Sequence, residues 1–223
     1  MIRNLAMSEE ILAKLEKAGI IAVLEIEKES DAIPVASALL EGGVNVIELA
    51  LRTQAAEPSI PLIAEKFPQM MIGVGTIIES GQAARVQRYA GVQFGVSPGI
   101  NPAIVREALS CGLPFAPGIA TPSELELALS LGCRAVKFFP AEGMGGLKFL
   151  KSIDAPYKHL GVRYIPLGGV TQNNLPDYAG ASQILAIGGS WIASKELIKA
   201  ANWSEITKAA KAAKQLWDDT RRK

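Results

Sequence analysis

The sequence has few of the residues that build metal centres and disulfide frameworks. Its 223 residues include two cysteines and one histidine. Cys111 and Cys133 show no CxxC spacing and no nearby histidine, which argues against a zinc site and a disulfide framework. His159, in the polar stretch APYKHLG, is expected on the surface. We therefore predict two small buried thiols and little scope for a metal-assisted mechanism.

A charge imbalance and long apolar runs are also missing. The 23 basic and 22 acidic residues give a net charge of +1 without any block of like charges, so nothing predicts nucleic acid or a membrane surface as a partner. No apolar run approaches the roughly 18 residues of a membrane span, and residues 1–19 lack the apolar core of a signal peptide. We expect a cytoplasmic protein that holds any charged ligand with local side chains.

The sequence does contain a repeated alternation of short apolar runs and helical segments. Nearly continuous apolar runs are typical of strands buried on both faces of a parallel sheet. Helical spacing occurs between them, as at 31–43, 102–112 and 122–132, with Asp, Asn, Thr or Pro near the start and Gly at the end. The eight runs are IIAVLE (20–25), VNVIEL (44–49), MMIGVG (70–75), VQFGVS (92–97), LPFAPG (113–118), RAVKFFP (134–140), VRYIPLG (162–168) and SQILAIG (182–188).

A strand followed by a helix, repeated eight times, favours a (β/α)8 TIM barrel over an open doubly wound sheet. No linker interrupts residues 1–223, so we predict a single α/β barrel domain. An extra N-terminal helix at 8–18 is expected to cover the bottom of the barrel, and an amphipathic helix at 204–217 to pack outside it. Active sites in this fold lie at the carboxyl ends of the strands, so polar residues there are the functional candidates.

Lys137 is the strongest candidate for a catalytic residue, because it interrupts an apolar run. Alternation places Ala135, Lys137 and Phe139 on one face of the strand and Val136 and Phe138 on the other, and the barrel interior has room for a catalytic group. Lysine is rarely buried unless it is paired. An apolar pocket penalises an ammonium and so favours the neutral amine, the form that attacks a carbonyl to give a Schiff base. The alternative is a structural lysine that is ion-paired or reaches solvent.

Glu48, Arg52 and Thr76 follow the second and third runs. A carboxylate at Glu48 can move a proton beside an iminium, or it can simply form a buried salt bridge to Arg52 or Lys137. Arg52 and Thr76 can hold the carboxylate of a 2-oxo acid, or they can be a surface arginine and a turn threonine. Spacing alone leaves both alternatives open.

Two glycine pairs occupy equivalent positions after the last two runs, in PLGGV and IGGSW. Glycine lets backbone N–H groups approach an anion, and barrel enzymes often hold phosphate in these two loops. Ser190 is expected to open the following helix and to add a hydroxyl. The two pairs together favour a phosphate site over ordinary turns.

Seven ordered motifs between about residues 11 and 210 resemble the 2-keto-3-deoxy-6-phosphogluconate (KDPG) / 4-hydroxy-2-oxoglutarate (KHG) aldolase family. The resemblance implies a homotrimeric class I aldolase that cleaves KDPG to pyruvate and glyceraldehyde 3-phosphate through a covalent Schiff base, without a metal or other cofactor. The partners implied are the phosphorylated 2-keto sugar acid and pyruvate. The motifs are VNVIELALRT, IGVGT, SPGIN, PGIATPSE, VKFFPAE, LGGV and IGGSW.

The resemblance also implies a role for each candidate residue. Lys137 becomes the Schiff-base lysine and Glu48 the general acid and base, acting directly or through water. Arg52 and Thr76 hold the pyruvate carboxylate. The implied phosphate-binding residues are Gly168, Gly169, Gly189 and Ser190.

Three residues depart from patterns common in the family. Ala50 stands in ALRT where TLRT is frequent, Leu167 stands in PLGG where PTGG is frequent, and Glu25 replaces an arginine. Loss of a side-chain hydroxyl that hydrogen bonds to a substrate hydroxyl changes substrate specificity. Relatives that act on the C4-epimeric galactonate substrate also carry an apolar residue at the position of Leu167. Three alternatives therefore stay open: an aldolase for the C4 epimer, a phosphosugar epimerase or synthase on the same barrel, and a phosphosugar-acid-binding protein without activity.

Overall fold

The computed structural model describes residues 7–222, and no helix among them is long and apolar enough to cross a membrane. The strands are β1 (Ile20–Leu24), β2 (Val46–Ala50), β3 (Met71–Gly75), β4 (Val92–Val96), β5 (Phe115–Ala116), β6 (Gly118–Ile119), β7 (Ala135–Phe138), β8 (Arg163–Pro166) and β9 (Ile187–Gly189). The α-helices are α1 (Glu9–Ala18), α2 (Ala32–Glu41), α3 (Ala56–Lys66), α4 (Gln82–Val86), α5 (Pro102–Ser110), α6 (Pro122–Ser130), α7 (Gly146–Asp154), α8 (Leu175–Ala179), α9 (Lys195–Lys199) and α10 (Trp203–Arg221). Short 3-10 turns are η1 (Glu29–Asp31), η2 (Glu142–Met144) and η3 (Ala155–Leu160), and the last of these carries His159 on the surface as predicted.

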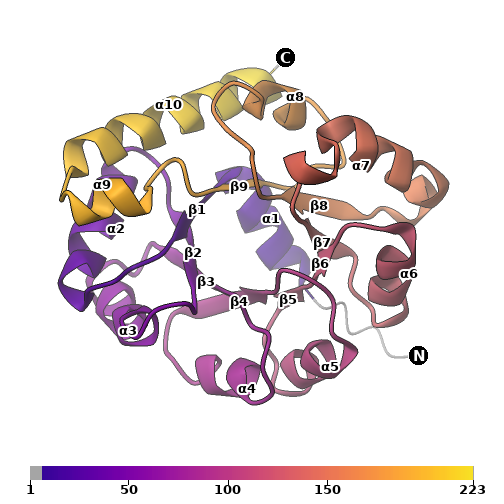
Figure 1. The fold of residues 1–223 in the computed structure, drawn as a ribbon, viewed down its shortest axis with the longest axis horizontal. Coiled ribbons are helices and arrows are strands. Elements are labelled where there is room, and N and C mark those ends of the chain that lie inside the picture. The colour runs from indigo at the N-terminus through magenta and orange to yellow at the C-terminus, as the bar shows by residue number, and fades with distance from the viewer. Residues whose placement is uncertain (1–6, 223) are drawn as a thin grey trace.

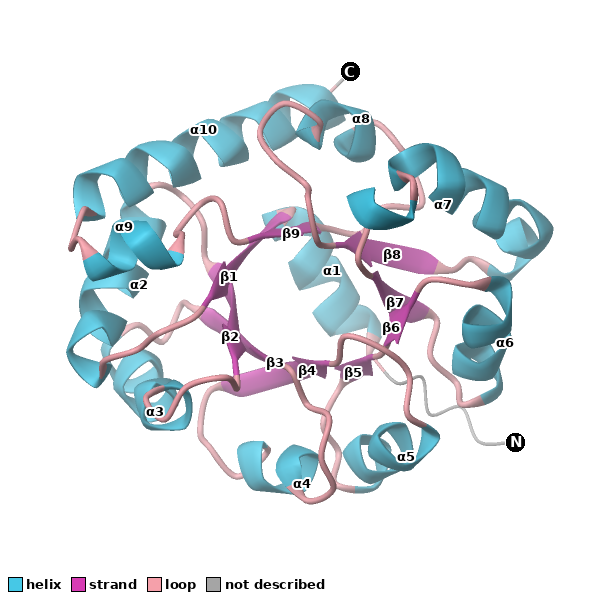
Figure 2. Cartoon of the chain, in the orientation of Figure 1, coloured by secondary structure: helices cyan, strands magenta, loops and turns pink. Residues whose placement is uncertain are grey.

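The strands form a ring of parallel neighbours surrounded by helices (Figure 2). One six-stranded sheet runs in the order β5-β4-β3-β2-β1-β9, and a second runs β6-β7-β8. The two sheets meet where Tyr164 bridges Ile184, just before β9. This ring of strands with helices outside confirms the predicted α/β barrel class.

The fifth predicted run forms two short strands instead of one. Pro117 separates β5 from β6, and it lacks the N–H that a continuous strand would donate. Its carbonyl still accepts a hydrogen bond from the Lys137 N–H at 2.9 Å. As a result β5 pairs with β4 while β6 pairs with β7, and the chain between them continues the ring.

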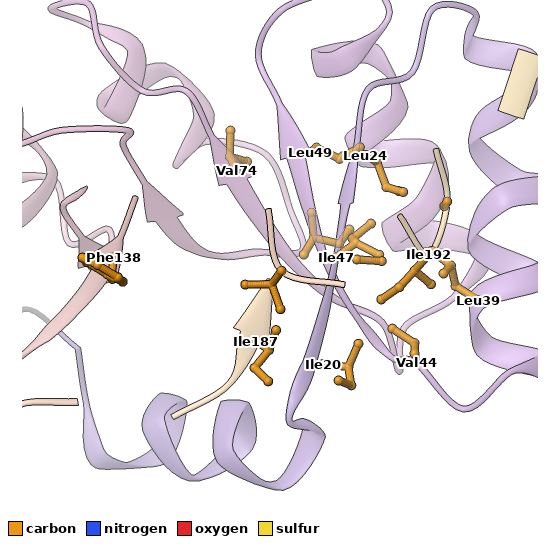
Figure 3. Packing of buried hydrophobic residues seen from close by; sticks show 14 of the residues in the cluster. Ile20, Leu24, Leu39, Val44, Ile47, Leu49, Val74, Phe138, Ile187 and Ile192 are labelled. Atoms are coloured by element: carbon orange, nitrogen blue, oxygen red, sulfur yellow. The ribbon is translucent and has the colours of Figure 1, made fainter. Parts of the chain in front are cut away.

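Two apolar layers lie on opposite sides of the strands. The outer layer joins strand residues such as Ile47 and Leu49 to helix residues such as Leu39 (Figure 3). The inner layer fills the ring and includes Phe94 and Ile165. Complete burial of one such side chain contributes about 1.5–3 kcal/mol, so these layers dominate the stability of the fold.

The extra N-terminal helix lies across one end of the ring (Figure 1). Leu15 of α1 packs in the inner layer with Val46 and Met71, which are the first residues of their strands. The predicted helix at 8–18 therefore covers the amino ends of the strands, as expected. Its bounds follow from Ser8, whose side chain accepts a hydrogen bond from the N–H of Ile11, and from Gly19, which ends it with a left-handed backbone.

Helix α10 lies outside the ring and packs against α2 and α8 (Figure 1). It confirms the predicted outer helix, but it extends to Arg221 because buried residues continue through Trp217. Helix α6 begins at a capping box in which Thr121 and Glu124 exchange side-chain and backbone hydrogen bonds. A cap of this kind contributes about 1 kcal/mol.

Candidate active site

Lys137 lies on β7 with its side chain inside the ring. Ala135 and Phe139 pack in the inner layer, whereas Val136 and Phe138 belong to the outer layer. The alternation predicted for this strand is therefore confirmed. Lys137 is only 6% exposed, so its amine needs a partner inside the protein.

That partner is Glu48, which reaches Lys137 from β2 across the ring. The distance from Lys137 Nζ to Glu48 Oε1 is 2.9 Å, and the two side chains are 7% and 3% exposed. Lys137 Nζ also lies 5.5 Å from the centre of the Phe139 ring. The sequence predicted apolar surroundings for this amine, and the structure adds a carboxylate that can accept its proton.

Gly75 makes room for this carboxylate. It is the last residue of β3 and pairs with Ala50 of β2. A Cβ atom at Gly75 would overlap Oε1 of Glu48. A side chain here would therefore push Glu48 away from Lys137, which gives Gly75 a role that the sequence analysis missed. The motif IGVGT, in which this glycine ends a strand, could have indicated this role.

Arg52 and Thr76 lie together after β2 and β3, as predicted. Arg52 Nε donates a hydrogen bond to Thr76 Oγ1 at 3.4 Å. The same guanidinium also pairs with Glu25, with 3.3 Å between Nη1 and Oε2. Thr53 fixes the loop after β2 by donating to the carbonyl of Ile26 after β1. Contacts with the segments that follow β1 and β3, on both sides of β2, thus hold the Arg52 guanidinium in position.

Thr76 has a left-handed backbone with a φ of 63°. This conformation costs a residue with a side chain roughly 1–2 kcal/mol. Such strain persists where the surrounding structure enforces it, and it is concentrated at functional sites. In this conformation the Thr76 hydroxyl accepts the hydrogen bond from Arg52.

A pocket of about 400 Å³ opens beside Lys137 at the carboxyl ends of the strands. Glu48 adjoins it through Lys137, and Thr76 adjoins it through Arg52. Gly169 is exposed beside the pocket and does not line it. The predicted site residues that line the pocket are Lys137, Arg52, Ala50, Leu167, Gly168, Gly189 and Ser190.

The two glycine loops differ in the conformation that they require. Gly168 and Gly169 have φ values of 91° and 83°, which favour glycine. Ser190 follows β9 but does not open a helix, so that prediction was wrong. The helix begins at Lys195 because the side chain of Ser194 accepts a hydrogen bond from the N–H of Leu197.

The sequence analysis also missed Lys195. A helix that began at Ser190 would have placed Lys195 inside the helix, whereas Lys195 is the first residue of α9 and lines the pocket. Its Nζ lies 2.7 Å from Glu27 Oε1 and 3.1 Å from Glu25 Oε1. The interactions in which Lys195 donates to the carboxylates of Glu27 and then Glu25 raise the pKa of Lys195 above its ordinary value. Lys195 therefore adds a third cation to a pocket that holds Lys137 and Arg52.

No group of three or more His, Cys, Asp or Glu side chains within residues 7–222 is arranged to hold a metal ion. The chemistry that the site offers comes from an amine and a carboxylate in contact, next to a pocket whose lining includes three cations and two carboxylates. An amine beside a proton acceptor can condense with a ketone, and the cations can hold an anionic ketone against it.

A model of the family described as KDPG and KHG aldolase matches residues 11–209. The chain belongs to the KDPG and KHG aldolase family. Its relative from Treponema pallidum, a 2-dehydro-3-deoxy-phosphogluconate aldolase, is 39% identical over 92% of this chain and 97% of the relative.

Solved structures of the family agree with the fold. KDPG aldolase from Legionella pneumophila, with pyruvate captured as a covalent carbinolamine intermediate, has a TM-score of 0.85 and 37% identity, covering 91% of this chain and 97% of that one. The Zymomonas mobilis enzyme with 3-phosphoglycerate has a TM-score of 0.79 and 35% identity, with coverages of 92% and 96%. Membership of this aldolase family thus rests on most of the chain.

Proposed function

We propose that the chain is a class I aldolase, a lyase that cleaves KDPG to pyruvate and glyceraldehyde 3-phosphate. The observation that carries the proposal is the buried contact between Lys137 and Glu48 beside the pocket. The carbinolamine captured in the Legionella pneumophila relative supports an amine as the nucleophile. An amine alone would also suit other imine chemistry, but the carboxylate at 2.9 Å adds the proton transfer that aldol cleavage needs.

Lys137 first passes a proton to Glu48, and the neutral amine attacks the C2 ketone. Glu48 returns this proton to the departing hydroxyl, so that water leaves, an iminium forms and Glu48 is again a carboxylate. Glu48 takes the proton of the C4 hydroxyl as the C3–C4 bond breaks. The electrons of that bond pass to the iminium, which becomes an enamine, and the aldehyde leaves. Return of the proton from Glu48 to C3, followed by hydrolysis, releases pyruvate and the free amine. General acid and base catalysis by Glu48 accelerates the reaction by about 10²–10⁴-fold.

The two ends of the substrate are assigned to different parts of the pocket. Arg52, supported by Thr76, holds the carboxylate, because a guanidinium offers two parallel donors. The loops that carry Gly168, Gly189 and Ser190 offer backbone N–H groups and a hydroxyl to the phosphate. Binding of 3-phosphoglycerate to the Zymomonas mobilis relative supports a phosphate-binding function in the family. Gly169 does not line the pocket, so we propose that it contributes to phosphate binding by allowing the backbone conformation of this loop.

Specificity at C4 is assigned to Ala50 and Leu167. Both side chains are buried and line the pocket, and neither can hydrogen bond to a substrate hydroxyl. The apolar wall favours the C4-epimeric 2-keto-3-deoxy-6-phosphogalactonate as a second candidate substrate. KHG, which gives pyruvate and glyoxylate, is a third.

A pyruvate-release assay coupled to lactate dehydrogenase tests the reaction on KDPG, its C4 epimer and KHG side by side. We expect release from KDPG, no effect of EDTA, and loss of turnover in K137M. A phosphosugar epimerase would turn over the substrate without releasing pyruvate. A binding protein would be stabilised by the sugar acid without any turnover.

The assembly and the location of the protein remain predictions from the sequence. A homotrimer is implied by the family resemblance, and light scattering on the purified protein measures it. The cytoplasmic location is tested by fractionating cells that produce the chain.

A further inference from the structure

Lys195 is the cation of the pocket that the proposed function leaves unused. Lys137 forms the imine and Arg52 holds the carboxylate, whereas Lys195 lines the same pocket with Gly189 and Ser190. Its side chain is 46% exposed, so it is accessible to a ligand. A lysine on a flexible four-carbon stem would ordinarily move freely at such a position.

Two carboxylates fix the position of Lys195. Its amine forms an ion pair with Glu27 at 2.7 Å and donates a hydrogen bond to Glu25 at 3.1 Å. Glu25 follows β1, which lies between β9 and β2 in the sheet. The other oxygen of Glu25 pairs with Arg52. The carboxylate of Glu25 thus contacts Lys195 with one oxygen and Arg52 with the other, and so links the two cations of the pocket.

We propose that Lys195 is a specificity-determining residue that binds the phosphate of the aldol substrate, and that Glu25 and Glu27 are positioning residues for it. This inference rests on the proposed function. Both an ammonium and a guanidinium bind phosphate, so their positions separate the two roles. Lys195 lines the pocket with Gly189 and Ser190 of the proposed phosphate loop. Arg52 instead contacts Thr76 at the proposed carboxylate site. The two anionic ends of one substrate therefore have separate cations, with the reactive amine of Lys137 also in the pocket.

Steady-state kinetics on the full chain test the role of Lys195. K195M removes the charge and keeps much of the side-chain length. We expect KM for KDPG to rise about tenfold or more with kcat nearly unchanged, because a charge-assisted contact to the bound phosphate is lost. The same variant should cleave 2-keto-3-deoxygluconate, which lacks the phosphate, as well as the wild type does. Inorganic phosphate should inhibit K195M about tenfold less strongly, and K195R should recover most of the affinity.

Lys199 supplies the matched control. It lies four residues further along α9, is exposed, and does not line the pocket. K199M should keep the wild-type KM. An equal loss on both substrates in K195M, the same loss in K199M, or an unchanged KM for KDPG in K195M would each overturn the inference.

Trapping pyruvate with borohydride separates this inference from the proposed function. K195M should still form the adduct on Lys137, because pyruvate carries no phosphate. Absence of the adduct in the wild type would refute the aldolase mechanism itself. A normal adduct together with an unchanged KM for KDPG in K195M would refute only the role of Lys195.

Discussion

The buried pair of Lys137 and Glu48 makes a prediction about stability that needs no substrate. Both side chains are less than a tenth exposed, so solvent screens their interaction weakly. Removing one partner of a buried ion pair leaves the other charge unpaired, at a cost of about 3–5 kcal/mol. We expect K137M to lower the free energy of unfolding by this amount, and E48Q by about 1–3 kcal/mol, since its amide oxygen still accepts from the amine.

The double variant K137M/E48Q removes both charges at once. Its loss of stability should therefore fall short of the sum of the single losses by roughly 1.5–3 kcal/mol. Urea unfolding, followed by circular dichroism at one fixed protein concentration, measures all four proteins and prevents differences in assembly from entering the comparison.

The exposed pair of Lys14 and Glu10 is the matched control for this cycle. Its side chains are 51% and 75% exposed and lie one helical turn apart. The same substitutions there should give a coupling of about 0.3–0.5 kcal/mol. Additive losses at Lys137 and Glu48, or equal coupling in the two pairs, would refute the account of the buried contact.

Three further outcomes follow from individual residues. T76G should unfold no more easily than the wild type, because relief of about 1–2 kcal/mol of backbone strain offsets the greater conformational freedom of glycine in the unfolded chain. It should bind pyruvate more weakly, as measured by calorimetry. A large loss of stability would contradict this explanation. L167T should shift the ratio of kcat/KM toward KDPG over its C4 epimer by about tenfold, and an unchanged ratio would remove Leu167 from the specificity site. Burial raises the pKa of Cys133 from 9.0 to about 12, so its stabilising effect is complete below pH 9 and is lost as the pH rises toward 12. At pH 8 this thiol should react with iodoacetamide only after unfolding, and rapid native labelling detected by peptide mass mapping would contradict the burial.

Much of the fold was predictable because its signals are local. Apolar runs, helix caps and terminal glycines are read within a few residues, and they located the barrel strands and most of the helices between them. Pro117 split the fifth run, since a proline cannot donate to the ladder. Ser190 was misread because Ser194, four residues later, makes the hydrogen bond that starts the helix.

The site was predictable where alternation within one strand decided it. The inward face of Lys137 followed from its neighbours, but its contact with Glu48 joins residues 89 positions apart in the chain. Closing the ring creates that contact, as it creates the row of Arg52, Glu25 and Lys195. Spacing along the chain carries no record of such contacts, which is why the sequence left Glu48 open between a catalytic role and a salt bridge.

Lys137 is the nucleophile of the proposed reaction. Incubation with pyruvate, reduction with borohydride and peptide mass mapping test it most directly. We expect one stable adduct, on Lys137, which K137M does not form. No adduct, or an adduct on another lysine, would contradict it.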